Sequence, residues 1–351
     1  MRALVISGGG SKGAFAVGAL KYLMLENGLD FDVLAGTSTG ALIVPMIAAL
    51  GKAALSTLET EYTTVTTADI LDGSPVERVI DGKPSLHGSG PLRKRIEARV
   101  TQAVFDALHT SKKRVALTAV DLHDGKLVYF QTGLMPIASN DPVVQVQSRD
   151  QLVNAIHSSA SFPVFMPPVA NSRPGAPADT YVDGGVREYV PIEITIDAGV
   201  DEIACIILAP PRDKQATFDD PSPNVLDVAQ RVIDLLSEEV GSSDVKLSQL
   251  YTDANVYINA VVARLRAAGV KDDVIVPAFQ SAGVRNPFAG KRAVSLRIIR
   301  PQQPLKGDTL TFTPADMKAN LDYGFQCAKE QWDAGRQVQV PALAGQPSPV
   351  G

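Results

Sequence analysis

The chain has 351 residues, of which 45% are hydrophobic and 20% are charged, and its formal net charge is −5 at pH 7. That length accommodates one large domain or two ordinary ones, and the composition is typical of a globular protein. A nucleic-acid-binding protein normally presents a basic face, so the net negative charge predicts no nucleic-acid partner.

The cysteines and the apolar runs indicate the cellular compartment in which the protein is expected. Cys205 and Cys327 lie far apart in apolar stretches, which favours buried thiols over a disulfide. The apolar run at the N-terminus is too short for the core of a signal peptide. No stretch approaches the roughly 18 apolar residues of a membrane span. We therefore expect a cytoplasmic protein without a signal peptide or a transmembrane segment, and leave export by a signal-independent route open.

The first 50 residues alternate buried strands with helices. Residues 2–7 form a short apolar run, as expected of a strand buried on both faces. A glycine loop at 8–13 leads into a helix over 14–26, which Asn27-Gly28 ends. A second apolar strand, ending near Ala35, leads into another helix. This order predicts a parallel sheet with right-handed crossovers.

The rest of the chain continues the pattern of strands and helices. Strands are expected at 115–120, 126–131, 181–183, 202–209 and 294–299. Helices are expected after the caps Ser148 and Asn224, over 247–265, and from Thr313-Pro314 onward. Because no clean linker interrupts the sequence, we predict one α/β domain over 1–340, with helical elaboration after about residue 210, and a disordered tail over 341–351.

The stretch GTSTG, residues 36–40, matches the pattern G-x-S-x-G. Gly36 and Gly40 suit a strained strand-to-helix turn, where other side chains would collide. Such a turn presents the hydroxyl of Ser38 at the start of a helix, where partial positive charge favours a developing negative charge. The pattern arises by chance in many proteins, but the buried strand before it and the helix after it favour a nucleophile over a plain turn.

The stretch GGGSKG, residues 8–13, has three interpretations. A dinucleotide-binding loop needs an acid at the end of the second strand, which instead reads Ala35-Gly36-Thr37. A phosphate-binding P-loop needs its lysine after the final glycine, and Lys12 precedes it. The third is an oxyanion hole, which the position of both glycine turns at one sheet edge favours. Its backbone N–H donors would come from Gly8, Gly9, Gly10, Ser11, Lys12 and Gly13.

The base that would activate Ser38 is the next question. In α/β-hydrolases the order is Ser, then Asp, then His, but all four histidines (87, 109, 123 and 157) precede Asp183. His157, on a predicted helix, favours core packing over catalysis. Of the Asp-Gly pairs at 72, 81, 124 and 183, only Asp183 ends an apolar run, where desolvation would make it a better base. These residues alone leave a turn and a base as equal alternatives for Asp183.

Together the three stretches resemble the patatin-like phospholipase family. GGGSKG matches its G-G-G-x-[KR]-G oxyanion loop, GTSTG its nucleophile elbow, and Asp183-Gly184-Gly185 its D-G-[GA] motif, in the family's order and within about residues 1–200. The resemblance implies a three-layer α/β/α fold with a mostly parallel central sheet. It also implies a Ser38–Asp183 dyad that cleaves acyl esters of phospholipids or lysophospholipids through an acyl-serine intermediate, without a metal or cofactor.

Several alternatives remain at this point. The same fold can transfer the acyl group to an acceptor other than water. The glycine loop can belong to a nucleotide-binding regulator, or the chain can be a lipid-binding module without catalysis. Lys12 either steers a phosphate or pairs on the surface, and transient membrane contact is expected through apolar loops near residues 60–90. Head group, acyl length, oligomeric state and the role of residues 200–351 are not predicted.

Overall fold

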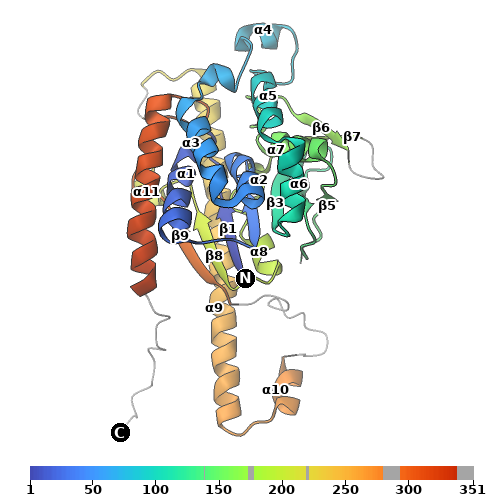
Figure 1. Cartoon of the computed structure of the whole chain (residues 1–351), viewed down its shortest axis with the longest axis vertical. Helices are drawn as coiled ribbons and strands as arrows, with labels where there is room; N and C mark the ends of the chain where they lie inside the picture. The colour runs from blue at the N-terminus through green and yellow to red at the C-terminus, as the bar shows by residue number, and fades with distance from the viewer. Residues whose placement is uncertain (138, 173–177, 219–220, 280–292, 338–351) are drawn as a thin grey trace.

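The structure is a computed structural model of the whole chain, and it describes residues 1–137, 139–172, 178–218, 221–279 and 293–337. Figure 1 shows a central sheet covered by helices, with one long helix, α9 (Val225–Ala267), extending beyond the body. The predicted tail, residues 341–351, lies outside the described residues.

The central sheet has a parallel middle. Strands β3, β2, β1, β8 and β9 lie side by side in that order and run parallel. β4 and β7 both pair antiparallel with β3, β5 pairs parallel with β4, and β6 pairs antiparallel with β7. The strand bounds are β1 (Arg2–Ile6), β2 (Val33–Gly36), β3 (Arg114–Asp121), β4 (Leu127–Thr132), β5 (Val143–Gln145), β6 (Val169–Ser172), β7 (Ala178–Asp183), β8 (Glu202–Ile206) and β9 (Ser295–Ile299).

Helices cover both faces of this sheet. Alternate residues of a strand point to opposite faces, so Leu4 and Ile6 of β1 pack in the core beneath one helical layer, while Ala3 and Val5 pack in a second core beneath the other. The first layer holds α1 (Gly13–Lys21), α2 (Thr39–Leu50), α3 (Ala54–Thr64), α5 (Gly90–Arg99), α6 (Gln102–Thr110), α7 (Arg149–Ser159) and α11 (Pro314–Gln337). The second holds α8 (Glu193–Asp197) and part of α9. The predicted three-layer α/β/α fold is therefore confirmed.

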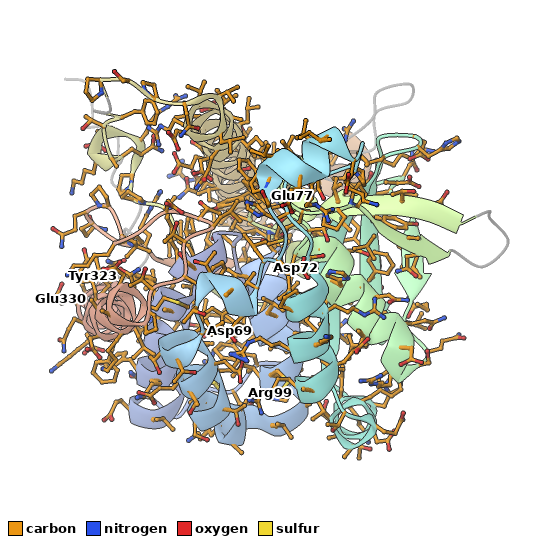
Figure 2. The ribbon with its side chains drawn as sticks, turned by 90° about the horizontal axis from the view of Figure 1, so that it is seen from above. Asp69, Asp72, Glu77, Arg99, Tyr323 and Glu330 are labelled. Atoms are coloured by element: carbon orange, nitrogen blue, oxygen red, sulfur yellow. The ribbon has the colours of Figure 1, made fainter. Side chains whose placement is uncertain are left out.

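Shorter elements connect these layers. Figure 2 shows α11, marked by Tyr323 and Glu330, at one side of the first layer and α5, marked by Arg99, nearer its middle. The connecting elements are η1 (Gly10–Lys12), η2 (Tyr22–Glu26), η3 (Gly51–Ala53), η4 (Thr67–Asp69), α4 (Pro75–Ile80), η5 (Gly184–Val186), η6 (Arg212–Lys214) and α10 (Asp272–Ala278).

Helix α9 differs from the prediction of two helices. It runs unbroken for 43 residues, and its start is capped as predicted, since the Asn224 side chain accepts the N–H groups of Leu226 at 2.8 Å and Asp227 at 3.2 Å. Near its middle Gly241 passes so close to Tyr189 that a Cβ there would lie 2.8 Å from the tyrosine ring. The polar, small residues between the two predicted helices are therefore the place where one helix crosses the body of the protein.

The helical stretch Thr39–Thr64 corrects the expectation that no segment is long and apolar enough to span a membrane. This stretch of 26 residues is long and apolar enough by length and composition, and 56% of its most apolar window is buried inside the fold. Its first part, α2, is apolar because it packs in the main core, where Ile43, Val44 and Ile47 are fully buried. It is also the helix that Ser38 precedes.

Candidate active site

Ser38 lies in the turn between β2 and α2, in a backbone conformation that few residues adopt. Its φ is 56° and its ψ is −119°, a strain of about 1–3 kcal/mol for a residue with a side chain. The flanking glycines make the turn possible, because a Cβ on Gly36 would lie 2.5 Å from the carbonyl carbon of Gly40, and one on Gly40 would lie 2.3 Å from the carbonyl oxygen of Ile6. The predicted nucleophile elbow thus has the geometry that its glycines imply.

Asp183 ends β7, where it lies opposite Ala119 of β3. The side chain is buried, and its Oδ1 accepts the N–H of Gly185 at 2.8 Å. Burial raises the pKa of Asp183 to about 6, against the lowering effect of hydrogen bonding from Ser38 and Gly185. Oδ2 has no hydrogen-bond partner among the described residues, so this carboxylate beside Ser38 keeps an oxygen with unused capacity.

A polar contact joins the Ser38 turn to β3, the strand that pairs with the strand of Asp183. The Thr37 hydroxyl donates to the carbonyl oxygen of Glu188 at 3.0 Å, and its oxygen lies in hydrogen-bond contact with the hydroxyl of Thr118 on β3 at 2.7 Å. Gly184 packs directly on Thr118, since a Cβ there would lie 2.1 Å from its hydroxyl oxygen. This packing fixes the elbow and the Asp183 turn relative to each other.

The glycine loop divides its backbone donors between the fold and the site. Among the described residues, no acceptor is hydrogen-bonded to the N–H groups of Gly9 and Gly10. Both residues line pockets that also contain Ser38. The other N–H groups are used within the protein: Gly8 donates to Tyr189 O, Ser11 to Thr309 O, Lys12 to Gly9 O, and Gly13 to Gly10 O or Ser11 O. Of the six backbone N–H groups predicted to form an oxyanion hole, those of Gly9 and Gly10 are therefore the two left to bind an oxyanion.

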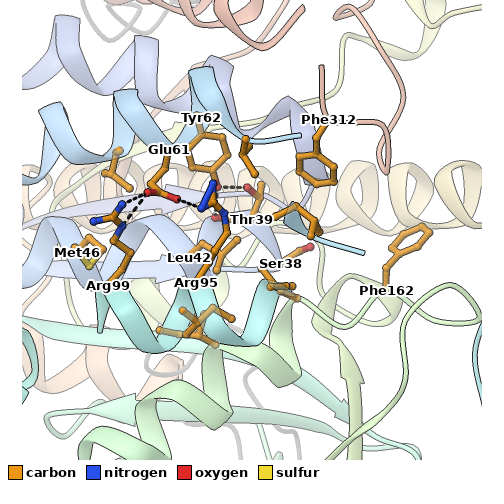
Figure 3. A pocket seen from close by; sticks show the side chains of 18 of the residues that line it. Ser38, Thr39, Leu42, Met46, Glu61, Tyr62, Arg95, Arg99, Phe162 and Phe312 are labelled. Carbon is orange, nitrogen blue, oxygen red and sulfur yellow. Dashed lines mark hydrogen bonds and ion pairs between the residues drawn. The ribbon is translucent and has the colours of Figure 1, made fainter. Parts of the chain in front are cut away.

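One pocket at Ser38 is apolar. It takes in about 990 Å³ of space, part of which is open to solvent. Figure 3 shows Ser38, Phe162 and Phe312 at one end, and Met46, Glu61 and Arg99 at the other. Glu61 binds Arg99 by a hydrogen-bonded ion pair and lies 3.8 Å from Arg95. The apolar wall is formed by Leu42, Met46, Leu58, Val65, Ile70, Leu92, Ile96, Val100, Ile156, Ala160, Phe162, Met166, Leu310 and Phe312.

The second pocket at Ser38 is smaller and charged. It takes in about 440 Å³ of space, part of which is open to solvent, and both Ser38 and Asp183 line it. Lys12 reaches it from the glycine loop, and Asp234 and Glu238 reach it from α9. These two acids could not be singled out from the sequence, because their i, i+4 spacing on a helix is equally typical of a solvated face.

The remaining candidates lie elsewhere. His157 is buried, and its Nε2 lies 2.9 Å from the Ser89 hydroxyl. Burial lowers the pKa of His157 to about 4. It is not among the described residues that line either pocket. Gly82 and Gly125, which follow Asp81 and Asp124, have φ of 64° and 69°, as turns require. No group of three or more metal-ligating side chains is found in the part of the chain that the structure describes.

Comparisons with known proteins address the family of the chain. A family model for patatin-like phospholipase matches residues 4–196, which is more than half of the chain. Among solved structures, VipD from Legionella pneumophila is 13% identical with a TM-score of 0.46, the match covering 95% of this chain and 67% of that one. Human GIVD cytosolic phospholipase A2 is 11% identical with a TM-score of 0.45, covering 96% of this chain and 59% of that one. No curated protein sequence matches. On the family match, the chain belongs to the patatin-like phospholipase family.

Proposed function

We propose that the protein is a serine acyl hydrolase that cleaves fatty-acyl esters of phospholipids or lysophospholipids. The observation that carries this proposal is the position of Ser38, on a strained turn where an apolar pocket and a charged pocket meet. An acyl chain fits the apolar pocket, and the alcohol part of the ester fits the charged one. Family membership supports lipid esters as the substrate class.

In the first half of the reaction, Ser38 Oγ attacks the ester carbonyl while Asp183 takes the hydroxyl proton. With a pKa of about 6, Asp183 is ionised at neutral pH and is a stronger base than an exposed carboxylate. The N–H groups of Gly9 and Gly10 stabilise the oxyanion, and losing one such donor typically costs about 2.7–4 kcal/mol of transition-state stabilisation. The C–O bond then breaks, Asp183 returns the proton to the leaving alcohol, and acyl-Ser38 remains.

In the second half, water replaces the alcohol. Asp183 takes a proton from the water as its oxygen attacks the acyl-Ser38 carbonyl, and the same N–H groups hold the second oxyanion. The bond to Oγ breaks, Oγ recovers the proton, and the fatty acid leaves. The reaction consumes one water for each ester cleaved and needs no other reactant.

Nucleotide binding is the weaker alternative. Most of the N–H groups that would cradle a phosphate, including those of Ser11 and Lys12, are hydrogen-bonded within the fold. Acyl transfer shares every step up to acyl-Ser38 and differs only in the acceptor. Adding an alcohol acceptor to the assay separates the two, because transfer yields a new ester in place of free fatty acid.

Labelling with a fluorophosphonate tests the proposal. We expect intact mass spectrometry to find one adduct, on Ser38, that is absent in Ser38→Ala. Asp183→Asn should label at least about a hundredfold more slowly, because it loses the base. Asp124→Asn is the matched control, since that residue precedes a glycine in a surface turn and bonds the N–H of Lys126. Labelling that survives in Ser38→Ala, or no adduct on folded wild-type protein, would refute the proposal.

A further inference from the structure

The charged pocket is lined by three carboxylates, of Asp183, Asp234 and Glu238, and by one ammonium, of Lys12. Asp234 and Glu238 lie one helical turn apart on α9 and line the pocket together with Lys12. Lys12 lowers the pKa of both acids, while burial raises each of them. Arg231 also lowers the pKa of both acids, and Arg300 lowers that of Glu238, but neither arginine is among the described residues that line the pocket. The lining itself therefore carries a negative excess when its acids and Lys12 are ionised.

Two carboxylate oxygens in this pocket have unused hydrogen-bonding capacity. Asp234 is held by the Thr309 hydroxyl, which donates to its Oδ1 at 2.8 Å. Glu238 Oε2, in contrast, is out of contact with solvent and has no hydrogen-bond partner among the described residues. Oδ2 of Asp183, a side chain that is only 4% exposed, also lacks a partner, but it belongs to the base proposed for Ser38. A carboxylate oxygen removed from water without a hydrogen-bond donor is costly, so a ligand that supplies positive charge beside Glu238 would stabilise this arrangement.

We propose that this pocket binds the head group of a zwitterionic glycerophospholipid, with the ammonium of choline or ethanolamine against Asp234 and Glu238 and the phosphate against Lys12. The inference rests on the proposed function, in which the alcohol part of the ester enters this pocket. It adds the choice of head group, which the motifs in residues 8–13, 36–40 and 183–185 do not contain.

Charge decides between head groups. A lipid phosphate beside Lys12 neutralises the one cation that lines the pocket. Asp234 and Glu238 then face the head-group alcohol that is esterified to that phosphate. A choline or ethanolamine places an ammonium there, whereas a glycerol or a bare phosphate leaves like charges together. Both acids come from α9, which lies beyond the segment that the family model matches, residues 4–196. Head-group choice is therefore a property that the C-terminal part of this chain adds to the fold.

Competition between head groups tests the inference. The substrates are phosphatidylcholine, phosphatidylethanolamine, phosphatidylglycerol and phosphatidic acid with identical acyl chains, each in mixed micelles with a neutral detergent. Initial rates of fatty-acid release should favour the two zwitterionic lipids at least about tenfold in the wild type. Glu238→Gln, and more strongly Asp234→Asn with Glu238→Gln, should bring the choline-to-glycerol ratio close to one. The ratio is internal to each enzyme, so a change in the active fraction does not alter it.

Glu239→Gln is the matched control for the ratio. Glu239 is the next residue on α9, is half exposed, and pairs with Arg212 on the surface outside the pocket. It should retain the wild-type ratio. A wild-type preference for the anionic lipids, or a ratio that Glu238→Gln leaves unchanged, would overturn the inference while hydrolysis itself upholds the proposed function.

A binding measurement distinguishes a failure of the head-group inference from a failure of the proposed hydrolase function. Diether analogues of the choline and glycerol lipids cannot be cleaved, and their binding to Ser38→Ala is followed by titration calorimetry in the same micelles. Tighter binding of the choline analogue, lost in Ser38→Ala with Glu238→Gln, supports the inference even when no ester is hydrolysed. Equal binding of the two analogues overturns it. Absence of fatty-acid release from all four lipids, with no fluorophosphonate adduct, counts against the proposed function instead.

Discussion

The pocket on one side of Ser38 is apolar and lies among α2, α3 and α5, whereas the pocket on the other side is charged and takes much of its wall from α9. The first belongs to the part of the chain that the family model matches, apart from Thr309, Leu310 and Phe312. The second draws its two helix acids from outside that part. In this chain, then, the apolar pocket is built mostly from the segment that the family model matches, whereas the two helix acids of the charged pocket come from the C-terminal part.

Acidification should affect the charged side most strongly. The pKa of Asp183 is raised to about 6, so the carboxylate base is present above pH 6 and is lost below it. With a short neutral ester, we expect kcat/KM to fall about tenfold for each pH unit below 6. A pH–rate profile from pH 4 to 9 measures this. A midpoint near pH 4, the usual range of an exposed carboxylate, would contradict the role of burial at Asp183.

Because its carboxylate is buried, Asp183 should lower the free energy of unfolding at pH values above 6. Its folded pKa of about 6 lies above its ordinary value of 3.8, so the folded state binds the proton more tightly and loses that advantage as pH rises through 6. Asp183→Asn should therefore stabilise the protein at pH 8 by up to about 3 kcal/mol, since each pKa unit corresponds to about 1.36 kcal/mol. Urea unfolding at pH 8 and pH 4 measures it. The gain should largely vanish at pH 4, and an equal gain at both values would exclude this cause.

Much of the fold and part of the site could be predicted from local signals. β1, β2, β3 and β8 are buried apolar runs, whereas β5 has only three residues and β6, Val-Ala-Asn-Ser, is half polar, so neither stands out in the sequence. Glycines 36 and 40 mark the Ser38 turn because only glycine fits there. Asp234 and Thr309 carried no signal, because they reach the site only through tertiary packing of segments distant in sequence.

The apolar pocket predicts a limit on acyl length. The pocket is lined by Ser38, which precedes α2, and by Leu42 and Met46 on successive turns of that helix. At 1.5 Å per residue, Met46 lies about 12 Å along the helix axis from Ser38. An extended chain spans about 3.6 Å for three bonds, so about ten carbon atoms reach the end formed by Glu61 and Arg99. Rates for nitrophenyl esters should peak near that length and fall for a C16 chain.

Arg95 should contribute to this limit, because its Nε is buried without a hydrogen-bond partner among the described residues and disfavours a methylene chain beside it. Arg95→Met should raise the ratio of C16 to C10 hydrolysis several-fold, on the order of 3- to 10-fold. Arg93→Met is the control, because Arg93 pairs with Glu97 and does not line the pocket. A ratio that responds equally to both variants would mean that charge on α5, not the pocket end, limits the chain.

The smallest effect on hydrolysis is expected from exposed apolar side chains at the surface, where α4 can be compared with Leu134. Val76, Val79 and Ile80 of α4 are 68%, 62% and 79% exposed, within the region where the sequence suggested membrane contact. Figure 1 shows α4 at one extreme of the molecule, and Figure 2 shows Glu77 and Asp72 with it on the face seen from above. Apolar side chains that project in this way gain free energy by entering a lipid surface.

Ile80→Ser should therefore lower hydrolysis of phosphatidylcholine vesicles about two- to fivefold and leave hydrolysis of a monomeric short-chain ester unchanged. Leu134→Ser is the control, because Leu134 is 82% exposed and follows β4 at the edge where β3 begins, away from the carboxyl ends of the parallel strands. A vesicle sedimentation assay measures binding directly. Equal losses in the two variants would point to a general effect of surface hydrophobicity, and a loss on the monomeric ester as well would place Ile80 in the support of the pocket.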